Sequence, residues 1–162
     1  MKQYLDLLQH IAETRPDWNI ILVGPEDNEF LASTLHQLPN VKFTGSRDIS
    51  DLPAYINSFD VCINPQLLNE VTIGNYPRKI DEYLAVGKPV VATSTDAMSV
   101  FAAHVYLGKS KEDYISLIGQ ALSENSEARI AARRAFASSH TWENSVAEIY
   151  EAIQLSGSRK RN

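Results

Sequence analysis

The sequence predicts an α/β domain in which helices cover a sheet of parallel strands. Two observations lead to this prediction. Short runs of β-branched and aliphatic residues recur along the chain, and amphipathic helical patterns separate one run from the next. Strands that alternate with helices are typical of parallel strands joined by right-handed crossovers in an open sheet. A length of 162 residues with 44% hydrophobic residues allows one domain with a real core and is too short for two full ones.

Helix and strand patterns alternate over the first two thirds of the chain. Each predicted strand is a short apolar run, and each predicted helix repeats apolar residues at helical spacing. The predicted order is helix 2–13, strand 20–23, helix 28–37, strand 41–44, helix 51–58, strand 61–64, helix 77–86, strand 90–93 and edge strand 104–107.

Three closing helices complete the predicted fold. Residues 111–124, 126–138 and 142–155 carry apolar residues at helical spacing and are mostly polar elsewhere. We expect these helices to cover the sheet, with Trp142 anchoring the last of them. The predicted domain spans residues 1–155, and the basic tail 156–162 is expected to be disordered.

The helix from residue 77 has clear start and stop signals. Pro77 suits the first helical position, where its missing N–H costs nothing, and Asn75 can cap the turn in front of it. Gly87 then ends the helix and leads into the strand at 90–93.

Lys79 and Glu82 stand on one face of this helix, near its N-terminus. Free N–H groups and the helix dipole already attract anions there, and a lysine adds to that attraction for a phosphate-bearing ligand. An ionised Glu82 can accept hydrogen bonds from hydroxyls such as those of a ribose. The spacing alone also fits an exposed pair on a solvated helix face.

The charge and the apolar pattern of the sequence argue against nucleic-acid binding and against a bilayer-spanning segment. The net charge is −5, and no basic stripe precedes the tail, so nucleic-acid binding has no electrostatic footprint. No apolar run is long enough to span a bilayer, and the first residues do not resemble a signal peptide. These two observations predict a cytoplasmic protein, located either in the cytoplasm or at the inner face of the membrane.

The single cysteine and the four histidines do not indicate redox or metal chemistry. Cys62 lies inside the apolar run 61–63, which predicts a packed thiol rather than a nucleophile. The histidines are scattered without ligand spacing, so we expect no metal site.

An ordered set of segments resembles a known family. The segments are Asn69-Glu70-Val71-Thr72, then Pro77, Lys79, 82–85, Gly87 and 89–91, preceded by 16–18, 20–25, 40–45, 52–56 and 59–61. Together they resemble the donor-binding half of group 1 glycosyltransferases, which have the two-domain GT-B fold. The resemblance implies a Rossmann-like parallel sheet, the C-terminal half of that fold, and it favours the functional interpretation of Lys79 and Glu82.

The resemblance implies roles for several residues. Lys79 is expected to stabilise the diphosphate leaving group, and Glu82 is expected to hold the ribose. Ligands of open parallel sheets lie beyond the carboxyl ends of the strands, which adds more candidates for substrate binding. These are Gly24, Ser46, Arg47, Asn64, Asn69, Thr72 and Pro77. For each of them a purely structural role, as a turn, a cap or a surface charge, remains open.

One departure from the family concerns its glutamate pair. The family commonly has two glutamates seven residues apart, and Gly74 stands where the first would fall if Glu82 is the second. Glu70 is the alternative catalytic candidate, because the string around it resembles a branch of the family that lacks the first glutamate. A solvated loop charge is the other interpretation of Glu70.

A second departure concerns missing parts. Family donor domains begin with a strand and a loop of basic residues, whereas this chain starts in the helix that follows. The acceptor-side domain is missing as well, so the chain resembles a fragment that is inactive alone and pairs with an N-terminal acceptor domain, which the helix 142–155 is able to approach. Unpaired sheet edges predict self-association or a rearranged edge.

The predicted function is to bind a nucleotide-diphosphate sugar, with a UDP-sugar first among the candidates. The resemblance implies transfer of a hexose to a glycan, lipid or other hydroxyl acceptor, with retention and without a cofactor. Two alternatives stay open. One is a non-catalytic sugar-nucleotide or partner-binding domain. The other is a receiver-like signalling module, for which Asp60 lies at the wrong end of its strand.

Overall fold

The computed structural model describes residues 2–66 and 77–140. The predicted helix 142–155, the predicted tail and the candidates Asn69, Glu70 and Thr72 lie outside the described residues.

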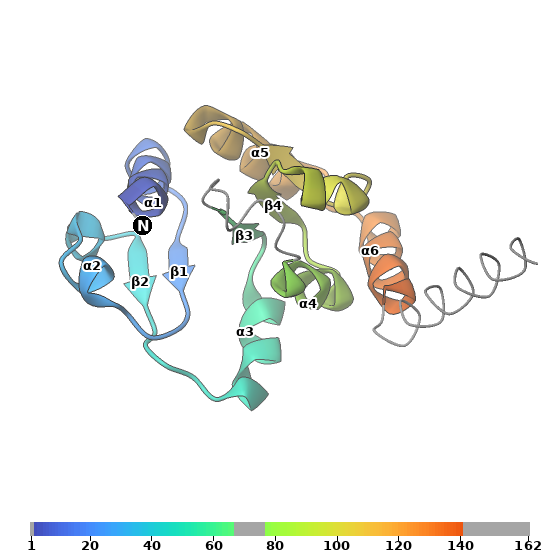
Figure 1. Ribbon diagram of the computed structural model, residues 1–162, viewed down its shortest axis with the longest axis horizontal. Coiled ribbons are helices and arrows are strands. Elements are labelled where there is room, and N and C mark those ends of the chain that lie inside the picture. The colour runs from blue at the N-terminus through green and yellow to red at the C-terminus, as the bar shows by residue number, and fades with distance from the viewer. Residues whose placement is uncertain (1, 67–76, 141–162) are drawn as a thin grey trace, which may run out of the picture.

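Helices and strands alternate along the described chain (Figure 1). The helices are α1 Lys2–Thr14, α2 Asn28–Leu31, α3 Leu52–Ser58, α4 Arg78–Val86, α5 Lys111–Ser123 and α6 Glu127–Ser139. The strands are β1 Ile20–Leu22, β2 Val41–Phe43, β3 Cys62–Asn64, β4 Val90–Thr93 and β5 Tyr106–Gly108. Three short 3-10 helices, η1 Thr34–Gln37, η2 Ile49–Asp51 and η3 Asp96–Phe101, complete the order.

The strands form two separate parallel sheets. β1 pairs with β2, and β3, β4 and β5 pair in that order, each pair being parallel. The predicted α/β class with parallel strands is therefore confirmed. One open sheet was expected, and the structure differs because the free edges of β1 and β3 are not hydrogen-bonded to each other. Figure 1 shows β1 and β2 with α1 and α2 on one side of the molecule, and the other three strands with α4, α5 and α6 on the other.

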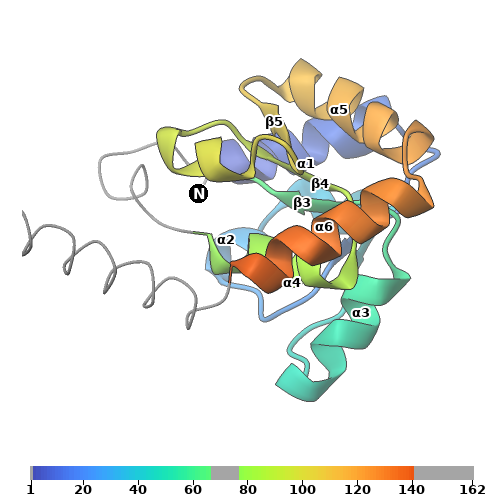
Figure 2. The ribbon, with the colours of Figure 1, turned by 90° about the vertical axis from the view of Figure 1, so that its right-hand side faces the viewer.

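Helices cover both faces of β4. Successive side chains of a strand point to opposite faces. Val91 accordingly packs with α1, α5 and the first sheet, whereas Val90 and Ala92 pack with α4 and η3. Figure 2 shows the same layers, with α5 on one side of β3 and β4 and with α4 and α6 on the other. All four residues of β4 are buried, which is typical of a central strand in a parallel sheet.

The sequence predicted most element positions to within two residues, but one helix was wrong. The single helix expected over 28–37 is divided into α2 and η1. Asp27 caps the start, since its carboxylate accepts hydrogen bonds from the N–H groups of Glu29 and Phe30. The Ser33 hydroxyl donates to the Phe30 carbonyl over 2.7 Å, a local bond that competes with continued helix.

α6 is fixed to the end of α4 by a buried arginine. Arg133 is 3% exposed, and its Nε donates to the Gly87 carbonyl over 2.9 Å. Its Nη2 also donates to the Asn125 side chain. Because a buried guanidinium needs partners for its N–H groups, these bonds place α6 firmly against α4.

Candidate functional site

The start of α4 lies beside the carboxyl ends of the strands. Pro77 occupies the N-cap position and its carbonyl accepts a hydrogen bond from Ile80 N–H over 2.9 Å. The sequence predicted Pro77 one place later, as the first helical residue with Asn75 as the cap. The difference arises because Pro77 has ψ of 85°, outside the helical range, so the helix begins at Arg78.

Gly87 ends α4 as predicted. It has φ of 86° in the left-handed region, where glycine is favoured. The N–H groups of Gly87 and Lys88 donate to the carbonyls of Leu84 and Tyr83, over 2.8 and 3.0 Å. This arrangement satisfies carbonyls of the last helical turn and fixes the length of α4.

Lys79, Gly24 and Asn64 line one cavity. Its volume is about 490 Å³, a size typical of ligand sites. Lys79 is an exposed side chain in the first turn of α4, and Asn64 is the half-buried last residue of β3. The structure thus brings together three of the predicted residues, from three different segments, in the lining of one cavity.

Gly24 follows β1 and joins the ends of the first two strands. Its N–H donates to the Gly45 carbonyl over 3.1 Å, and the two residues form an isolated bridge. Gly24 has φ of 139°, which side chains rarely adopt, and no atom lies near the position of an added Cβ. The glycine is therefore required by its backbone conformation, and it leaves open space beside the cavity.

Glu82 lies one turn further along α4 than Lys79. Its side chain is exposed, and it is not among the residues that line the cavity. The two charged residues are thus on the same helix, with Lys79 towards the cavity and Glu82 beyond its rim.

Ser46 and Arg47 lie in the loop after β2 and are exposed. Neither is a lining residue of the cavity. The Arg47 guanidinium carbon lies 5.7 Å from the centre of the Tyr55 ring, within the range of a cation–π contact. The structure therefore does not gather these two residues with Lys79, Gly24 and Asn64.

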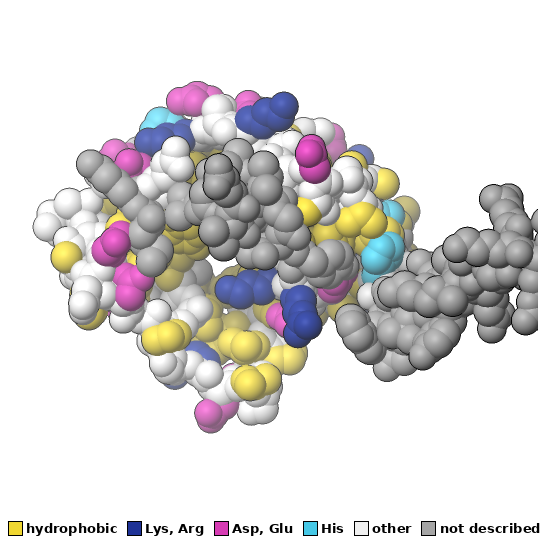
Figure 3. Space-filling model, in the orientation of Figure 1, with side chains coloured by type: hydrophobic (Ala, Val, Ile, Leu, Met, Phe, Trp, Pro, Cys, Tyr) yellow, Lys and Arg dark blue, Asp and Glu magenta, His cyan; other side chains and the backbone are white. Residues whose placement is uncertain are grey.

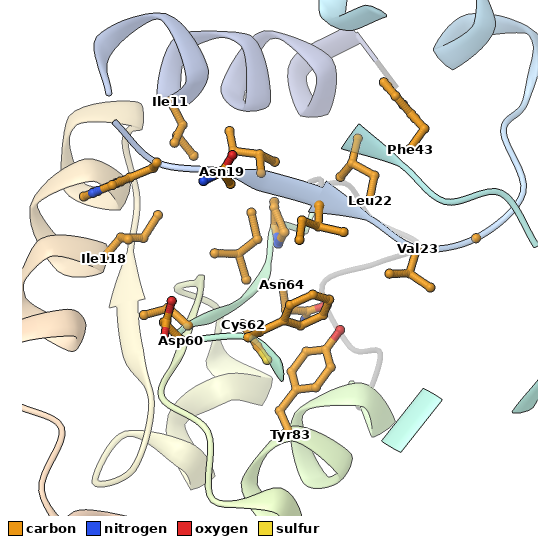
Figure 4. Close-up of a pocket in the computed structure, with 18 of the residues that line it drawn as sticks. Ile11, Asn19, Leu22, Val23, Phe43, Asp60, Cys62, Asn64, Tyr83 and Ile118 are labelled. Carbon is orange, nitrogen blue, oxygen red and sulfur yellow. The ribbon is translucent and has the colours of Figure 1, made fainter. Parts of the chain in front are cut away.

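Tyr83 was missed by the sequence analysis and lines the cavity (Figure 4). It follows Lys79 by four residues, so the two share a helix face, and this spacing was the available signal. Burial raises the pKa of the Tyr83 phenol to about 12, with smaller contributions from Cys62, Tyr4 and Glu82. The phenol is therefore protonated at neutral pH and can donate a hydrogen bond.

Cys62 is a packed thiol, as predicted. It is 4% exposed, and burial raises its pKa to about 12 in spite of the attraction from Lys88. Since the thiolate is the reactive form, Cys62 does not act as a nucleophile at neutral pH.

The Thr93 hydroxyl fixes the position of the residues that follow β3. Its hydroxyl oxygen accepts a hydrogen bond from Gln66 N–H over 2.8 Å and lies 2.9 Å from the Tyr114 hydroxyl. These bonds tie the residues that follow Asn64 to β4 and α5, so a rigid core positions this edge of the cavity.

The surface near the site is hollowed and carries basic side chains. Figure 3 shows Lys and Arg side chains over α4, next to a hollow with apolar side chains at its rim. An open, partly apolar cavity beside a helix N-terminus and a lysine can hold a ligand with an anionic group and a flat or apolar part. None of the helices within the described ranges is long and apolar enough to cross a membrane.

Comparison with known proteins gives two findings. Residues 1–124 match the family described as "Glycosyl transferases group 1". The chain is also 31% identical, over 157 aligned residues, to a protein of Bacillus subtilis (strain 168) named "Putative teichuronic acid biosynthesis glycosyltransferase TuaH". That alignment covers 91% of this chain and 40% of the Bacillus protein. The chain thus spans less than half the length of this relative.

Proposed function

The chain belongs to the group 1 glycosyltransferases, and from this premise we propose that it binds a nucleotide-diphosphate sugar as the donor half of a sugar-transferring enzyme. The proposed donor is a UDP-sugar, and the proposed reaction moves its hexose to a glycan, lipid or other hydroxyl acceptor with retention. The acceptor side belongs to an N-terminal domain of the whole enzyme, which works in the cytoplasm or at the inner face of the membrane. The relative's name, which refers to teichuronic acid biosynthesis, supports a polysaccharide acceptor.

The observation that carries this proposal is the position of Lys79. It stands in the first turn of α4, at the rim of a cavity into which the strand ends Gly24 and Asn64 also face. Backbone N–H groups at a helix start and a lysine ammonium together attract a diphosphate. When the glycosidic bond breaks, negative charge grows on that diphosphate, and a fixed cation stabilises it more than it stabilises the bound substrate.

Glu82 serves the ribose in this proposal. Its carboxylate is exposed, one helical turn from Lys79, and is able to accept hydrogen bonds from two neighbouring hydroxyls. Gly24 gives the ligand close access to the backbone, while the Asn64 amide offers a neutral partner for sugar hydroxyls. We keep Ser46 and Arg47 as contacts for the base, and Glu70, Asn69 and Thr72 as contacts for the sugar.

Calorimetric titration with UDP, GDP and ADP and with their sugar conjugates tests this proposal. We expect saturable binding of one nucleotide class. Glu82→Ala should weaken that binding about 10- to 100-fold, because hydrogen bonds to a charged acceptor are lost. Glu127→Ala is the matched control, since Glu127 is an exposed glutamate in the first turn of another helix, α6.

Two results would contradict the proposal. Equal affinity of Glu82→Ala and the unaltered chain would exclude the ribose role. If no nucleotide binds, and also none binds to a longer polypeptide that includes an acceptor domain, the chain is a partner-binding module rather than a donor domain.

A further inference from the structure

A second cavity lies at the amino end of β5, between that strand and α6. Its volume is about 340 Å³, within the size range of sites for small ligands. The lining comes from two segments, the chain that leads from η3 into β5 and one face of α6. It consists of residues 102–106 and of Arg129, Ala132 and Arg133, and we call it the α6 cavity.

The α6 cavity is separate from the cavity that Lys79 lines. The two cavities have no lining residue in common. The proposed donor site is at the carboxyl ends of β1 and β3, whereas residues 102–106 precede and begin β5. Figure 1 shows α6 at the side of the molecule away from β1 and β2. A ligand in the α6 cavity therefore does not compete with a donor for space.

Arg133 is a buried cation without an anionic partner among the described residues. It is 3% exposed, and its Nε and Nη2 donate to two neutral groups, the Gly87 carbonyl and the Asn125 side chain. Within residues 2–66 and 77–140, no carboxylate forms an ion pair with Arg133. Its Nη1 makes no hydrogen bond to those residues and reaches solvent-accessible space. Because burial of a charge without a counter-ion is costly, a bound anion would be stabilising here.

Arg129 adds a second guanidinium to the α6 cavity. It precedes Arg133 by four residues, so the two cations share one face of α6 and repel each other. Arg129 itself has a partner, because its Nη2 lies 3.1 Å from Glu124 Oε2 and its Nη1 donates to the Tyr106 hydroxyl over 3.2 Å. The Tyr106 hydroxyl donates to the same Glu124 oxygen over 3.0 Å. Glu124 thus compensates Arg129, and the positive charge of Arg133 remains.

His104 and three alanines complete the lining. Burial lowers the pKa of His104, and the charge of Arg133 lowers it further, so the ring is neutral at pH 7.5. A neutral imidazole has one N–H donor and one acceptor nitrogen. Ala102, Ala103 and Ala132 are exposed, and their short side chains leave room for an organic group beside the arginines.

From these observations we infer that the α6 cavity binds a small organic anion, whose phosphate or carboxylate group pairs with Arg133 and whose apolar part lies against the alanines. Guanidinium groups form charge-assisted hydrogen bonds with the oxygens of both kinds of anion. Such a ligand supplies the counter-ion that the described chain lacks, and Arg133 Nη1 is available to donate to it. The volume of about 340 Å³ leaves room for more than the anionic group alone.

Nuclear magnetic resonance titration of the whole chain with phenyl phosphate and with benzoate tests this inference. The two probes share a ring and differ in the anionic group, and benzyl alcohol is the neutral control. For at least one anion we expect saturable shifts at the amides of residues 102–106 and at the Arg133 Nε–H, with a Kd of about 1 mM or below. The bound anion should also raise the pKa of His104, because a nearby negative charge favours the imidazolium. The probe that binds more tightly identifies the preferred group.

Two alanine-to-glutamate variants locate the site. Ala131 and Ala132 are both exposed on α6, but Ala131 does not line the α6 cavity. Ala132→Glu places a carboxylate of the chain itself beside the arginines and should weaken anion binding at least about tenfold. Ala131→Glu makes the same charge change on the same helix and should weaken binding less than about twofold. Both variants keep Arg133 and its bond to Gly87, so the contact between α6 and α4 is preserved.

Four results would overturn the inference. They are the absence of saturable shifts with either anion, shifts of the same size with benzyl alcohol, equal weakening by the two glutamate variants, and shifts confined to residues 79–82. The last result would place the anion in the cavity that Lys79 lines. Lys79→Ala should leave binding in the α6 cavity unchanged, and no nucleotide is present in these experiments. Failure here and failure of donor binding are therefore distinguishable.

Discussion

Lys79 is the residue on which the proposed chemistry depends most. It is exposed, it is placed by a helix start whose bounds are fixed by Pro77 and Gly87, and it faces a cavity. Its neighbour Arg78 has the same charge and is exposed, but it does not line that cavity. Comparison of variants at Lys79 and at Arg78 therefore distinguishes a local effect on the ligand from the effect of a change in overall charge.

Replacing Lys79 should mainly lower turnover in the intact enzyme. For Lys79→Ala we expect kcat to fall about 100-fold or more, because electrostatic stabilisation of the leaving group is lost, with a smaller change in KM. Arg78→Ala should change kcat less than about threefold. Steady-state kinetics with a nucleotide-sugar donor measures both. Unchanged kcat with a raised KM in Lys79→Ala would mean that the lysine only binds the donor.

Protonation of His104 is expected to make the free energy of unfolding depend on pH. Burial lowers its pKa below the ordinary value of 6.5, and the nearby positive charge of Arg133 lowers it further. Its ring centre lies 4.5 Å from that of Phe136 on α6. The folded state therefore holds fewer protons at His104 than the unfolded state between these two pKa values.

The free energy of unfolding should consequently fall as the pH decreases below about 6.5. His104 contributes its full stabilisation at pH values above its pKa in the unfolded state. This stabilisation is lost as the pH falls from that pKa towards the lower pKa of His104 in the folded state. Urea unfolding at pH 7.5 and 5.0 measures this loss, and His104→Gln should make it smaller. The pKa values of Asp113 and Glu124 are also lowered, but these carboxyl groups affect the free energy of unfolding at more acidic pH. An equal loss in His104→Gln and in the unaltered chain would show that other groups cause it.

At the scale of elements, the junction of α4 and α6 depends on Gly87. A Cβ added there would lie 2.7 Å from Ile130 Cγ2 and 3.0 Å from Arg134 Nε, and the φ of 86° is unfavourable for any other residue. Arg133 also donates to the Gly87 carbonyl. Gly87 therefore ends α4 and also contacts α6.

Two glycine-to-alanine changes should have opposite effects. Gly87→Ala should lower the free energy of unfolding by about 2 kcal/mol or more, because the left-handed backbone and the contact with Ile130 both oppose a Cβ. Gly119→Ala should raise it by up to about 1 kcal/mol, because Gly119 is inside α5 and an added Cβ meets open space. Thermal and urea unfolding of both variants checks this. A stable Gly87→Ala would contradict the account of this junction.

Elements with strong local signals were predicted well. The strand Val90–Thr93 has the predicted bounds, since a glycine turn precedes it and both its faces are buried. The helix expected over 28–37 was wrong because hydrogen bonds within Asp27 to Ser33 divide it, and helical spacing does not reveal such competition. The 3-10 helix η3 was not predicted, although Thr95 caps it by accepting from Met98 N–H.

At the scale of the whole molecule, the fold class could be predicted and the lateral pairing of strands could not. The alternation of apolar runs and helices predicts parallel strands, but strand order depends on contacts between distant segments. The division into two sheets therefore emerged only from the structure. The same limit applies to the site. Gly24, Asn64 and Lys79 line one cavity, whereas Ser46 and Arg47 lie in a loop whose direction the sequence does not determine.

Nuclear magnetic resonance mapping of UDP binding tests the central claim most directly. On titration with UDP, we expect the largest backbone amide shifts at Gly24, Asn64 and residues 79–82, because the proposed site for the diphosphate and the ribose is the cavity rim and the start of α4. The Lys79→Ala variant should lose these shifts at the same UDP concentration. Saturable shifts confined to other surfaces, such as α6 and β5, would contradict the account and place nucleotide binding elsewhere on the molecule.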